Sequence, residues 1–241
     1  MNLKEHKFLG LPAYKPREWV DLSSTASKRA GLLMHRPGRK VLQWAVKILG
    51  WFAWLPIEKL LKGPVKRFDE LDGSELIEEM INEPIEFITY YMGNDTAKSK
   101  YTILIKTKSG KSYIAKLGKT PEAGSAIRHE AEVLQELVVK MPSIFYQIPV
   151  MVGDVGLKDN WTWSVQTVLP KGKSPTRLQK EHYDFLEVLK TAGLSHGDFA
   201  PWNCSIVDGQ LVAWDWEDAG PYVEGKDEAW FKKQVCELLG V

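Results

Sequence analysis

Cysteine is almost absent from this sequence of 241 residues, which contains only Cys204 and Cys236. Two cysteines are too few for a disulfide framework, and they lack the paired spacing of a zinc site. We therefore expect two buried free thiols in a reducing environment. Cys204 directly follows Asn203 and is interpreted as a core residue rather than a nucleophile.

Long apolar runs are absent as well. The most apolar stretch, residues 48–57, ends around Pro56 and is far shorter than the roughly 20 apolar residues that a spanning helix needs. The first residues mix charged and apolar side chains and contain no apolar core of secretory length. We expect a cytoplasmic protein that does not cross a bilayer.

The sequence also lacks an excess of either charge. Its 32 basic and 31 acidic side chains leave a formal net charge of +1, so the whole-molecule field does not favour nucleic acid as a partner. With 44% hydrophobic and 26% charged residues, the chain can form one large domain or two small lobes. No Gly-x-x-x-x-Gly-Lys-Ser/Thr loop occurs, which excludes the commonest nucleotide-binding loop.

Residues 1–70 differ in composition from the rest of the chain, and their main expected element is a helix over residues 41–61 that ends at Gly63-Pro64. This helix combines tryptophans with lysines, a composition that can lie in a membrane interface. The alternative, which we favour because the polar face is not strongly basic, is that the aromatic face packs on the rest of the domain. Peripheral membrane contact through 41–61 stays open.

From residue 85 the apolar pattern changes to the period of strands and then alternates with helices. The short connections predict three consecutive antiparallel strands, followed by a helix that carries Pro121 at its start. An Asp208-Gly209 turn indicates a later hairpin. The expected strands are 85–91, 101–107, 112–117, 150–155, 161–169, 204–207 and 210–214, and the expected helices are 122–138 and 178–191. This order predicts an α+β fold.

The helix over residues 122–138 carries one acidic residue on its apolar face. At 100° per residue, Glu130 falls in the middle of the stripe formed by Ile127, Ala131, Leu134, Leu137 and Val138. Glu132 points away and is interpreted as a solvated charge. A carboxylate in an apolar stripe needs a cation, and Lys116 at the end of the preceding strand is the candidate partner. A glutamate at the edge of the face, reaching water, is the common alternative.

The segment Ser195-His-Gly-Asp-Phe-Ala-Pro-Trp-Asn203 is followed, twelve residues after Asn203, by Asp215-Trp-Glu217. Phosphoryl transfer needs a carboxylate that accepts the proton of the acceptor hydroxyl, and oxygen ligands that hold magnesium against the nucleotide phosphates. Asp198, Asn203 and Asp215 provide this set. Chance occurrence of so many spaced polar residues in a plain loop is the much weaker interpretation.

These segments resemble those of the aminoglycoside phosphotransferase and choline kinase-like families of the protein-kinase-like superfamily. The resemblance implies that Asp198 is the catalytic base, that His196 orients its loop, and that Asn203 and Asp215 bind Mg2+. Glu217 either joins the metal shell through water or caps the segment.

The resemblance extends to the upstream strands. It implies that Lys116 contacts the nucleotide phosphates and that Glu130 is its ion-pair partner. Residues 92–100 stand where these families place a phosphate-covering loop, although Gly93 is its only glycine. Gln166 and Val168 resemble the hinge whose backbone binds the adenine edge of ATP.

The resemblance implies a protein-kinase-like two-lobed fold, with an N-terminal helical segment (1–70), an N-lobe with an antiparallel sheet and a helix (71–170), and a reduced C-lobe (171–241). The segment between Gly172 and His196 and the tail after Glu217 are both short, so much of the family's acceptor pocket is missing. We expect an ATP- and Mg2+-dependent phosphotransferase acting on a hydroxyl of a small molecule or saccharide.

Two alternatives remain. A catalytically inactive binding or scaffold protein is favoured by the short C-lobe and the glycine-poor loop, but it has no chemical need for all the motif residues. A protein kinase is less consistent with the sequence, because no activation segment with its closing motif follows Asp215.

Overall fold

A computed structural model describes residues 3–12, 16–34, 40–92, 96–144 and 147–239. The chain forms two compact units. The N-terminal unit comprises Met1–Ala123 with Gly156–Val165, and the C-terminal unit comprises Gly124–Val155 with Gln166–Val241. The sequence analysis divided the chain differently, into segments that end at residues 70 and 170. That division remains a prediction.

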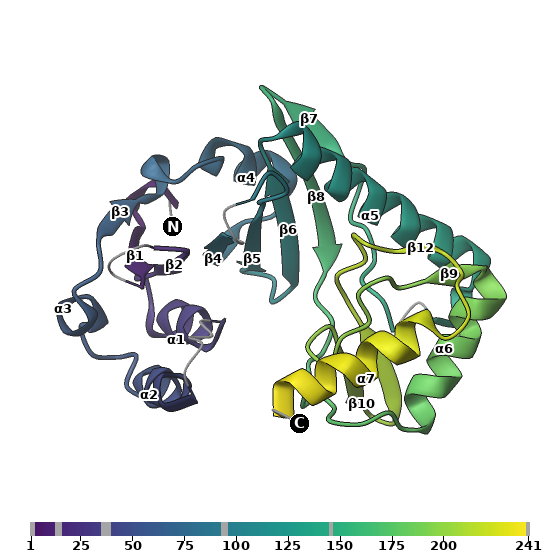
Figure 1. Cartoon of the computed structure of the whole chain (residues 1–241). Coiled ribbons are helices and arrows are strands. Elements are labelled where there is room, and N and C mark those ends of the chain that lie inside the picture. The colour runs from purple at the N-terminus through teal and green to yellow at the C-terminus, as the bar shows by residue number, and fades with distance from the viewer. Residues whose placement is uncertain (1–2, 13–15, 35–39, 93–95, 145–146, 240–241) are drawn as a thin grey trace. The chain divides into compact units, whose positions relative to one another are not determined.

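An eight-stranded sheet in the order β3-β1-β2-β4-β5-β6-β8-β7 organises the N-terminal unit (Figure 1). Every neighbouring pair whose register is described is antiparallel. The strands are β1 (Lys7–Leu11), β2 (Glu18–Asp21), β3 (Val65–Arg67), β4 (Ile85–Met92), β5 (Tyr101–Thr107), β6 (Ser112–Gly118), β7 (Gly156–Lys158) and β8 (Trp161–Thr167).

The central strands form where the sequence pattern predicts them. On β5, Ile103, Ile105 and Thr107 are buried and alternate with less buried residues, which is the period of a strand with one covered face. β4 and β6 extend the predicted ranges by one residue each. The three consecutive antiparallel strands are therefore confirmed.

Residues 1–70 contain strands that the sequence pattern did not predict. β1, β2 and β3 extend the sheet beyond β4, and Leu9, Leu11 and Val20 on these strands pack with Leu32 and Ile57 from the helices. The helices here are α1 (Thr25–Met34), α2 (Lys40–Trp51) and α3 (Ile57–Leu61). The single helix expected over 41–61 is wrong, because it breaks after Trp51 and restarts only after Pro56.

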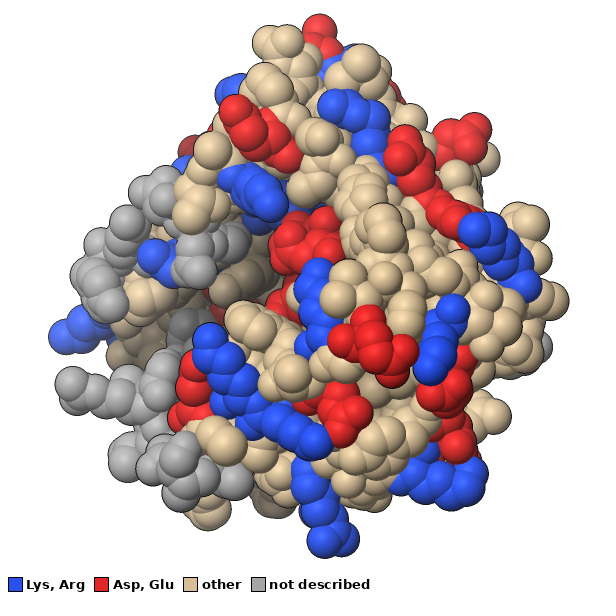
Figure 2. Space-filling model, turned by 45° about the vertical axis from the view of Figure 1, so that its right-hand side comes forward, with Lys and Arg blue, Asp and Glu red and all other residues tan. Residues whose placement is uncertain are grey.

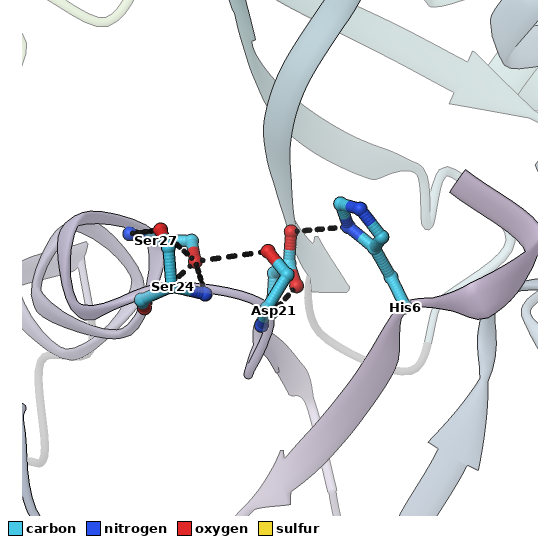
Figure 3. A network of polar contacts seen from close by, with 5 residues as sticks. His6, Asp21, Ser24 and Ser27 are labelled. Atoms are coloured by element: carbon cyan, nitrogen blue, oxygen red, sulfur yellow. Dashed lines mark hydrogen bonds and ion pairs between the residues drawn. The ribbon is translucent and has the colours of Figure 1, made fainter. Parts of the chain in front are cut away.

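A partly buried polar network connects the start of this sheet to α1 (Figure 3). The carboxylate of Asp21 contacts His6 Nδ1 at 2.9 Å and accepts the backbone N–H of Ser23 at 2.8 Å. Ser24 caps α1 by accepting the backbone N–H of Ser27 at 3.0 Å, while the Ser27 hydroxyl accepts the backbone N–H of Ser24 at 2.9 Å. This reciprocal pair fixes where α1 begins.

The β7–β8 hairpin differs from the expected pattern. Asp159 and Asn160 both have positive φ angles, 49° and 70°, as in a two-residue type I′ turn. This turn pairs Gly156–Lys158 with β8, so residues expected to be a loop form β7. The strand expected over 150–155 is wrong, and Met151 makes only an isolated bridge to Gln166.

The C-terminal unit consists of helices around two small sheets. Its helices are α5 (Pro121–Lys140), which begins in the other unit, α6 (Lys180–Ala192) and α7 (Lys226–Leu239), and its strands are β9 (Leu194–Ser195), β10 (Cys204–Val207), β11 (Gln210–Ala213) and β12 (Gly220–Pro221). β10 pairs with β11 and β9 with β12. The core is rich in buried aromatic rings, among them Phe185, Phe199, Trp216 and Phe231.

The predicted helices 122–138 and 178–191 and the Asp208-Gly209 hairpin are confirmed within two residues. Helices α4 (Ser74–Met80) and α7 were not predicted, nor were the 3-10 turns Leu3–Glu5, Phe68–Glu70 and Pro142–Ile144. Within the described ranges, none of the helices combines the length and the apolar character needed to span a membrane.

Candidate active site

The loop that begins at His196 is anchored by a carboxylate from α7. Asp227 is buried, and its two oxygens accept the backbone N–H groups of His196 at 2.7 Å and Gly197 at 3.0 Å. Hydrogen bonds to a charged acceptor are stronger than neutral ones, so α7 holds this loop by two of them. The last helix of the chain is thus part of the site.

The His196 side chain lies in the core beneath the loop. Its Nε2 is 3.2 Å from the Trp214 carbonyl oxygen, and its ring centroid is 4.4 Å from that of Trp216. Burial lowers the pKa of His196 below its ordinary value, against the opposing effect of nearby carboxylates, of which Asp227 acts most strongly. A neutral imidazole that donates from Nε2 to the Trp214 carbonyl links the two motif segments, and the loop-orienting role stays a prediction.

Asp198 has a defined donor for each carboxylate oxygen. Asn203 Nδ2 donates to Oδ2 at 2.8 Å and to the Asp198 backbone carbonyl at 3.0 Å. The indole Nε1 of Trp230, on α7, donates to Oδ1 at 2.6 Å. These two residues orient the carboxylate of Asp198, and Asp198 as a residue is only partly buried.

The β10–β11 hairpin places Asn203 beside the second motif segment. Cys204 pairs with Ala213, and the ladder continues through the backbone N–H of Trp214, which donates to the Asn203 carbonyl at 3.0 Å. Asp215 follows immediately with a φ angle of 70°. A positive φ angle is uncommon for a non-glycine residue. Asn203 and Asp215 are therefore neighbours across the end of the hairpin.

Helix α5 holds the segment after Asp215. Glu130 is fully buried, and its Oε1 accepts the backbone N–H of Trp216 at 3.2 Å. One residue earlier, His129 Nε2 contacts the Ala219 carbonyl at 2.7 Å. The predicted burial of Glu130 and exposure of Glu132 are both confirmed. The contact between Glu130 and the backbone of Trp216 was not predicted.

Position 197 requires a glycine because of its backbone conformation and because of the close packing around it. Its φ angle is 84°, and a Cβ atom at this position would lie 1.8 Å from the Asp218 carbonyl oxygen. No rotamer change of a side chain can relieve a clash with backbone. The two motif segments pack together closely because residue 197 has no side chain.

Lys116 and Glu130 lie in different units of the chain. Lys116 is buried on β6, opposite Thr102 of β5, and belongs to the N-terminal unit, whereas Glu130 belongs to the C-terminal unit. Their ion pair stays a prediction. Gly93 lies outside the described residues.

The expected hinge residues lie at the end of β8 and just after it. Gln166 is buried, while Val168 is 39% exposed. Val168 lines a cavity of about 440 Å³ in the C-terminal unit together with residues from the β10–β11 hairpin, among them Val207 and Val212. The cavity lies beside the expected hinge, and the hinge role stays a prediction.

The side-chain oxygens of Asn203 and Asp215 fit a magnesium ion that is bound together with nucleotide phosphates. Among the residues that the structure describes, no three His, Cys, Asp or Glu side chains gather into a metal cluster. Mg2+ is usually held by one or two carboxylates, waters and substrate phosphates rather than by an all-protein cage. Asn203 and Asp215 provide such a partial set, and Glu217 is partly exposed nearby in sequence.

The two cysteines have different environments. Cys204 is fully buried on β10, and burial raises the pKa of its thiol to about 12, so it is not a nucleophile at neutral pH. Cys236 is exposed on α7, so the expectation that both thiols are buried is wrong for this residue.

Comparison with known proteins identifies the fold. No family model and no curated protein sequence matches the chain. Among solved structures, the amicoumacin kinase hAmiN in complex with AMP-PNP, Ca2+ and Ami is similar over 71% of this chain and 71% of its own, with a TM-score of 0.50 and 13% sequence identity. An aminoglycoside phosphotransferase from Alicyclobacillus acidocaldarius subsp. acidocaldarius matches 68% of this chain and 71% of its own, with a TM-score of 0.46 and 13% identity.

A third neighbour is a kinase domain that matches over 56% of this chain and 52% of its own, with a TM-score of 0.40 and 14% identity. At such identities the likeness to the amicoumacin kinase establishes the fold alone. The chain has an α+β, kinase-like fold that is similar to the fold of the amicoumacin kinase. The expected fold class is therefore confirmed.

Proposed function

We propose that this protein is an ATP- and Mg2+-dependent phosphotransferase that phosphorylates a hydroxyl group of a small molecule or saccharide. The observation that carries the proposal is the arrangement around Asp198, whose two oxygens are oriented by Asn203 and Trp230 while the residue as a whole stays partly exposed. An oriented, accessible carboxylate is what a hydroxyl acceptor requires of its general base.

In the proposed reaction, Asp198 accepts a hydrogen bond from the acceptor hydroxyl and takes its proton as the oxygen attacks the γ-phosphorus of ATP. The bond between that phosphorus and the bridging oxygen breaks, and ADP leaves. His196 does not touch the reacting atoms in this scheme. It acts through its contacts with Trp214 and Trp216, which fix the loop of Asp198 relative to Asp215.

The metal-binding role falls to Asn203 and Asp215, which the hairpin ladder makes neighbours. When bound, Mg2+ neutralises charge on the nucleotide phosphates. Asn203 uses its amide nitrogen on Asp198, and its amide oxygen is left to face a cation. Glu217 is assigned to the metal shell through water.

Nucleotide contacts are assigned to both units. Lys116 is proposed to contact the phosphates, with Glu130 as its partner, and the segment containing Gly93 to cover them. The backbone around Gln166 and Val168 is proposed to bind the adenine edge beside the apolar cavity of about 440 Å³. AMP-PNP and Ca2+ in the amicoumacin kinase agree with nucleotide and divalent-cation use in this fold.

Transfer of labelled phosphate from γ-labelled ATP tests the proposal. A panel of aminoglycosides, monosaccharides, oligosaccharides and lipid-linked saccharides is incubated with the wild type and with Asp198→Asn. We expect Mg2+-dependent labelling of at least one acceptor class and a loss of roughly a hundredfold or more in the variant, because general-base catalysis contributes about 10²–10⁴ in rate.

The variant also separates chemistry from binding. Asp198→Asn keeps the side-chain shape, so nucleotide affinity should change little while turnover is lost. If the wild type binds ATP but turnover is absent with every acceptor and with water, the binding or scaffold function is correct instead.

A further inference from the structure

Helix α2 is apolar on two opposite faces, and only one of them is covered within its unit. Val46 and Leu49 pack against the core formed with α1 and β1, and Gly50 is buried. Trp44 and Trp51 lie about half a turn away from these residues, on the opposite face. Their exposed fractions are 70% and 77%. The aromatic face therefore does not pack on the rest of its own unit.

The exposed apolar surface continues past the end of α2. Ile48 lies between the two tryptophans on the same face, and Phe52 and Trp54 follow in the turn before α3, each at least 45% exposed. We name Trp44, Ile48, Trp51, Phe52 and Trp54 the tryptophan surface. Single exposed apolar residues are ordinary, but five large ones within eleven positions form a patch that marks an interaction site.

The position of α2 makes this surface accessible within its own unit. Helix α1 lies between α2 and strand β2, so α2 is the outer helix of this part of the N-terminal unit (Figure 1). The inner face of α2 meets α1, where Gly50 approaches Leu33. The outer face carries the tryptophan surface.

The segment that contains this surface is mostly basic. Residues 25–67 contain ten lysines and arginines and a single acidic residue, Glu58. Since the whole chain has a net charge of +1 and this segment has +9, the remaining residues together carry −8. Lys47, Lys59 and Lys62 are all exposed beside or just after the tryptophan surface. By contrast, acidic and basic side chains are interspersed over the face shown in Figure 2.

We propose that α2, the following turn and α3 form a membrane-docking element, which places the tryptophan surface in the headgroup region of an anionic bilayer. Tryptophan is enriched at membrane interfaces because its ring is apolar and its N–H is polar. Lysines beside it attract anionic lipids and keep their charged ends in the headgroup region. Neither contribution depends on the phosphotransfer function.

A second copy of this chain is the competing occupant, and the charge argues against it. A symmetric interface would bring the exposed Lys47, Lys59 and Lys62 of both copies close together, and like charges repel. An anionic lipid surface complements the same charge. The element has the tryptophan and lysine composition of helices that lie on a membrane, and it is too short to cross one.

Vesicle co-sedimentation tests this proposal. The full chain, without nucleotide, is mixed with vesicles of phosphatidylcholine alone and with vesicles of phosphatidylcholine and phosphatidylserine in equal amounts. We expect binding to the anionic vesicles that weakens as NaCl rises, because salt screens the lysines. The double variant Trp44→Ala/Trp51→Ala should bind weaker by roughly tenfold or more, since it removes two large side chains from the apolar contact.

The control variant is Leu157→Ala, which removes an equally exposed apolar side chain, 72% exposed on β7, and should bind as the wild type does. Urea unfolding verifies that all variants are folded, and alanine preserves the helix. Retention of the wild type in the supernatant with anionic vesicles would overturn the proposal, as would equal binding to both vesicle types.

Sedimentation velocity tests whether the tryptophan surface binds a second copy of the chain. A dimer that forms with rising concentration and is lost in Trp44→Ala/Trp51→Ala, without vesicle binding, would assign the tryptophan surface to a second copy and overturn the membrane proposal. Neither result bears on phosphotransfer, because no nucleotide or acceptor is present in these experiments.

Discussion

At the scale of single residues, the site is defined by how Asp198 is held. Two donors from different elements fix the carboxylate, Asn203 from the start of the hairpin and Trp230 from α7. The motif itself predicts Asn203 near Asp198, since the two are close in sequence. Trp230 lies 32 residues from Asp198, and no local pattern connects them. We assign Trp230 as a positioning residue, because it acts through Asp198.

The variant Trp230→Phe tests this assignment. It keeps an aromatic ring but removes the donor to Asp198 Oδ1. We expect kcat to fall by roughly tenfold with little change in the KM for ATP, because one hydrogen bond to a charged group contributes about 1.5–3 kcal/mol. Trp54→Phe is the control, since Trp54 is 66% exposed in the other unit. A loss of nucleotide affinity equal to the loss of kcat would contradict a positioning role.

Gly197 gives a second prediction at this scale. Alanine would need a φ angle of 84° and a Cβ atom 1.8 Å from the Asp218 carbonyl oxygen. We expect Gly197→Ala to lower the free energy of unfolding by about 2 kcal/mol or more and to abolish turnover. Gly209→Ala is the control, because its φ angle is also positive at 77° but its Cβ meets nothing within 4 Å. An equal loss of unfolding free energy in both variants would show that the positive φ angle, and not the close packing around Gly197, causes the loss.

At the scale of elements, α7 holds the loop that contains His196, Gly197 and Asp198. The short tail after Glu217 was expected to leave the C-lobe reduced, and the sequence pattern indicated no role for it. In the structure this tail forms the helix that supplies Asp227 and Trp230. Acidic residues near a helix N-terminus are common caps, so Asp227 by itself gave no signal of its contact with His196.

Asp227→Asn tests the anchoring role of α7. The amide can accept one of the two backbone N–H groups but presents its own donors to the other. We expect the free energy of unfolding to fall by about 2–3 kcal/mol, measured by urea denaturation. Glu228→Gln is the control on the same helix, because its ion pair with Lys232 is exposed and should contribute less than about 0.5 kcal/mol. Equal stability of the two variants would contradict the anchoring.

The elements that the sequence predicted are those with strong local periodicity. β5 and α5 follow from their alternation and their apolar stripe, and the β10–β11 hairpin follows from Asp208-Gly209. β1–β3 were missed because each is short and lies among prolines and glycines, so its place depends on pairing with distant strands. In the same way, the motif predicted the site residues. The contacts of these residues with α5 and α7 could not be predicted, because they depend on tertiary packing.

At the scale of the whole molecule, buried histidines link stability to pH. Burial lowers the pKa of His182 and of His196 below the ordinary value near 6.5. In the unfolded chain both take up protons near pH 6.5, while in the folded chain they stay neutral to lower pH. The free energy of unfolding should therefore be highest above pH 6.5 and should decline as the pH falls below it.

Urea unfolding at pH 7.5 and 5.5 measures this dependence. We expect a lower free energy of unfolding at pH 5.5, and a smaller difference between the two pH values in His182→Gln, which removes one of the two groups. Glu83, whose pKa Lys111 lowers to about 2, is ionised over this range and does not contribute to the difference. A wild type with the same stability at both pH values would contradict the account.

The central claim is that the two motif segments form a magnesium-nucleotide site, and the most direct test needs no knowledge of the acceptor. Mg2+-ATP is titrated calorimetrically into the wild type and into Asp215→Asn. We predict binding that requires Mg2+ and is weakened roughly tenfold or more in the variant, because a charged metal ligand is lost. Absence of nucleotide binding to folded wild-type protein would contradict the assignment.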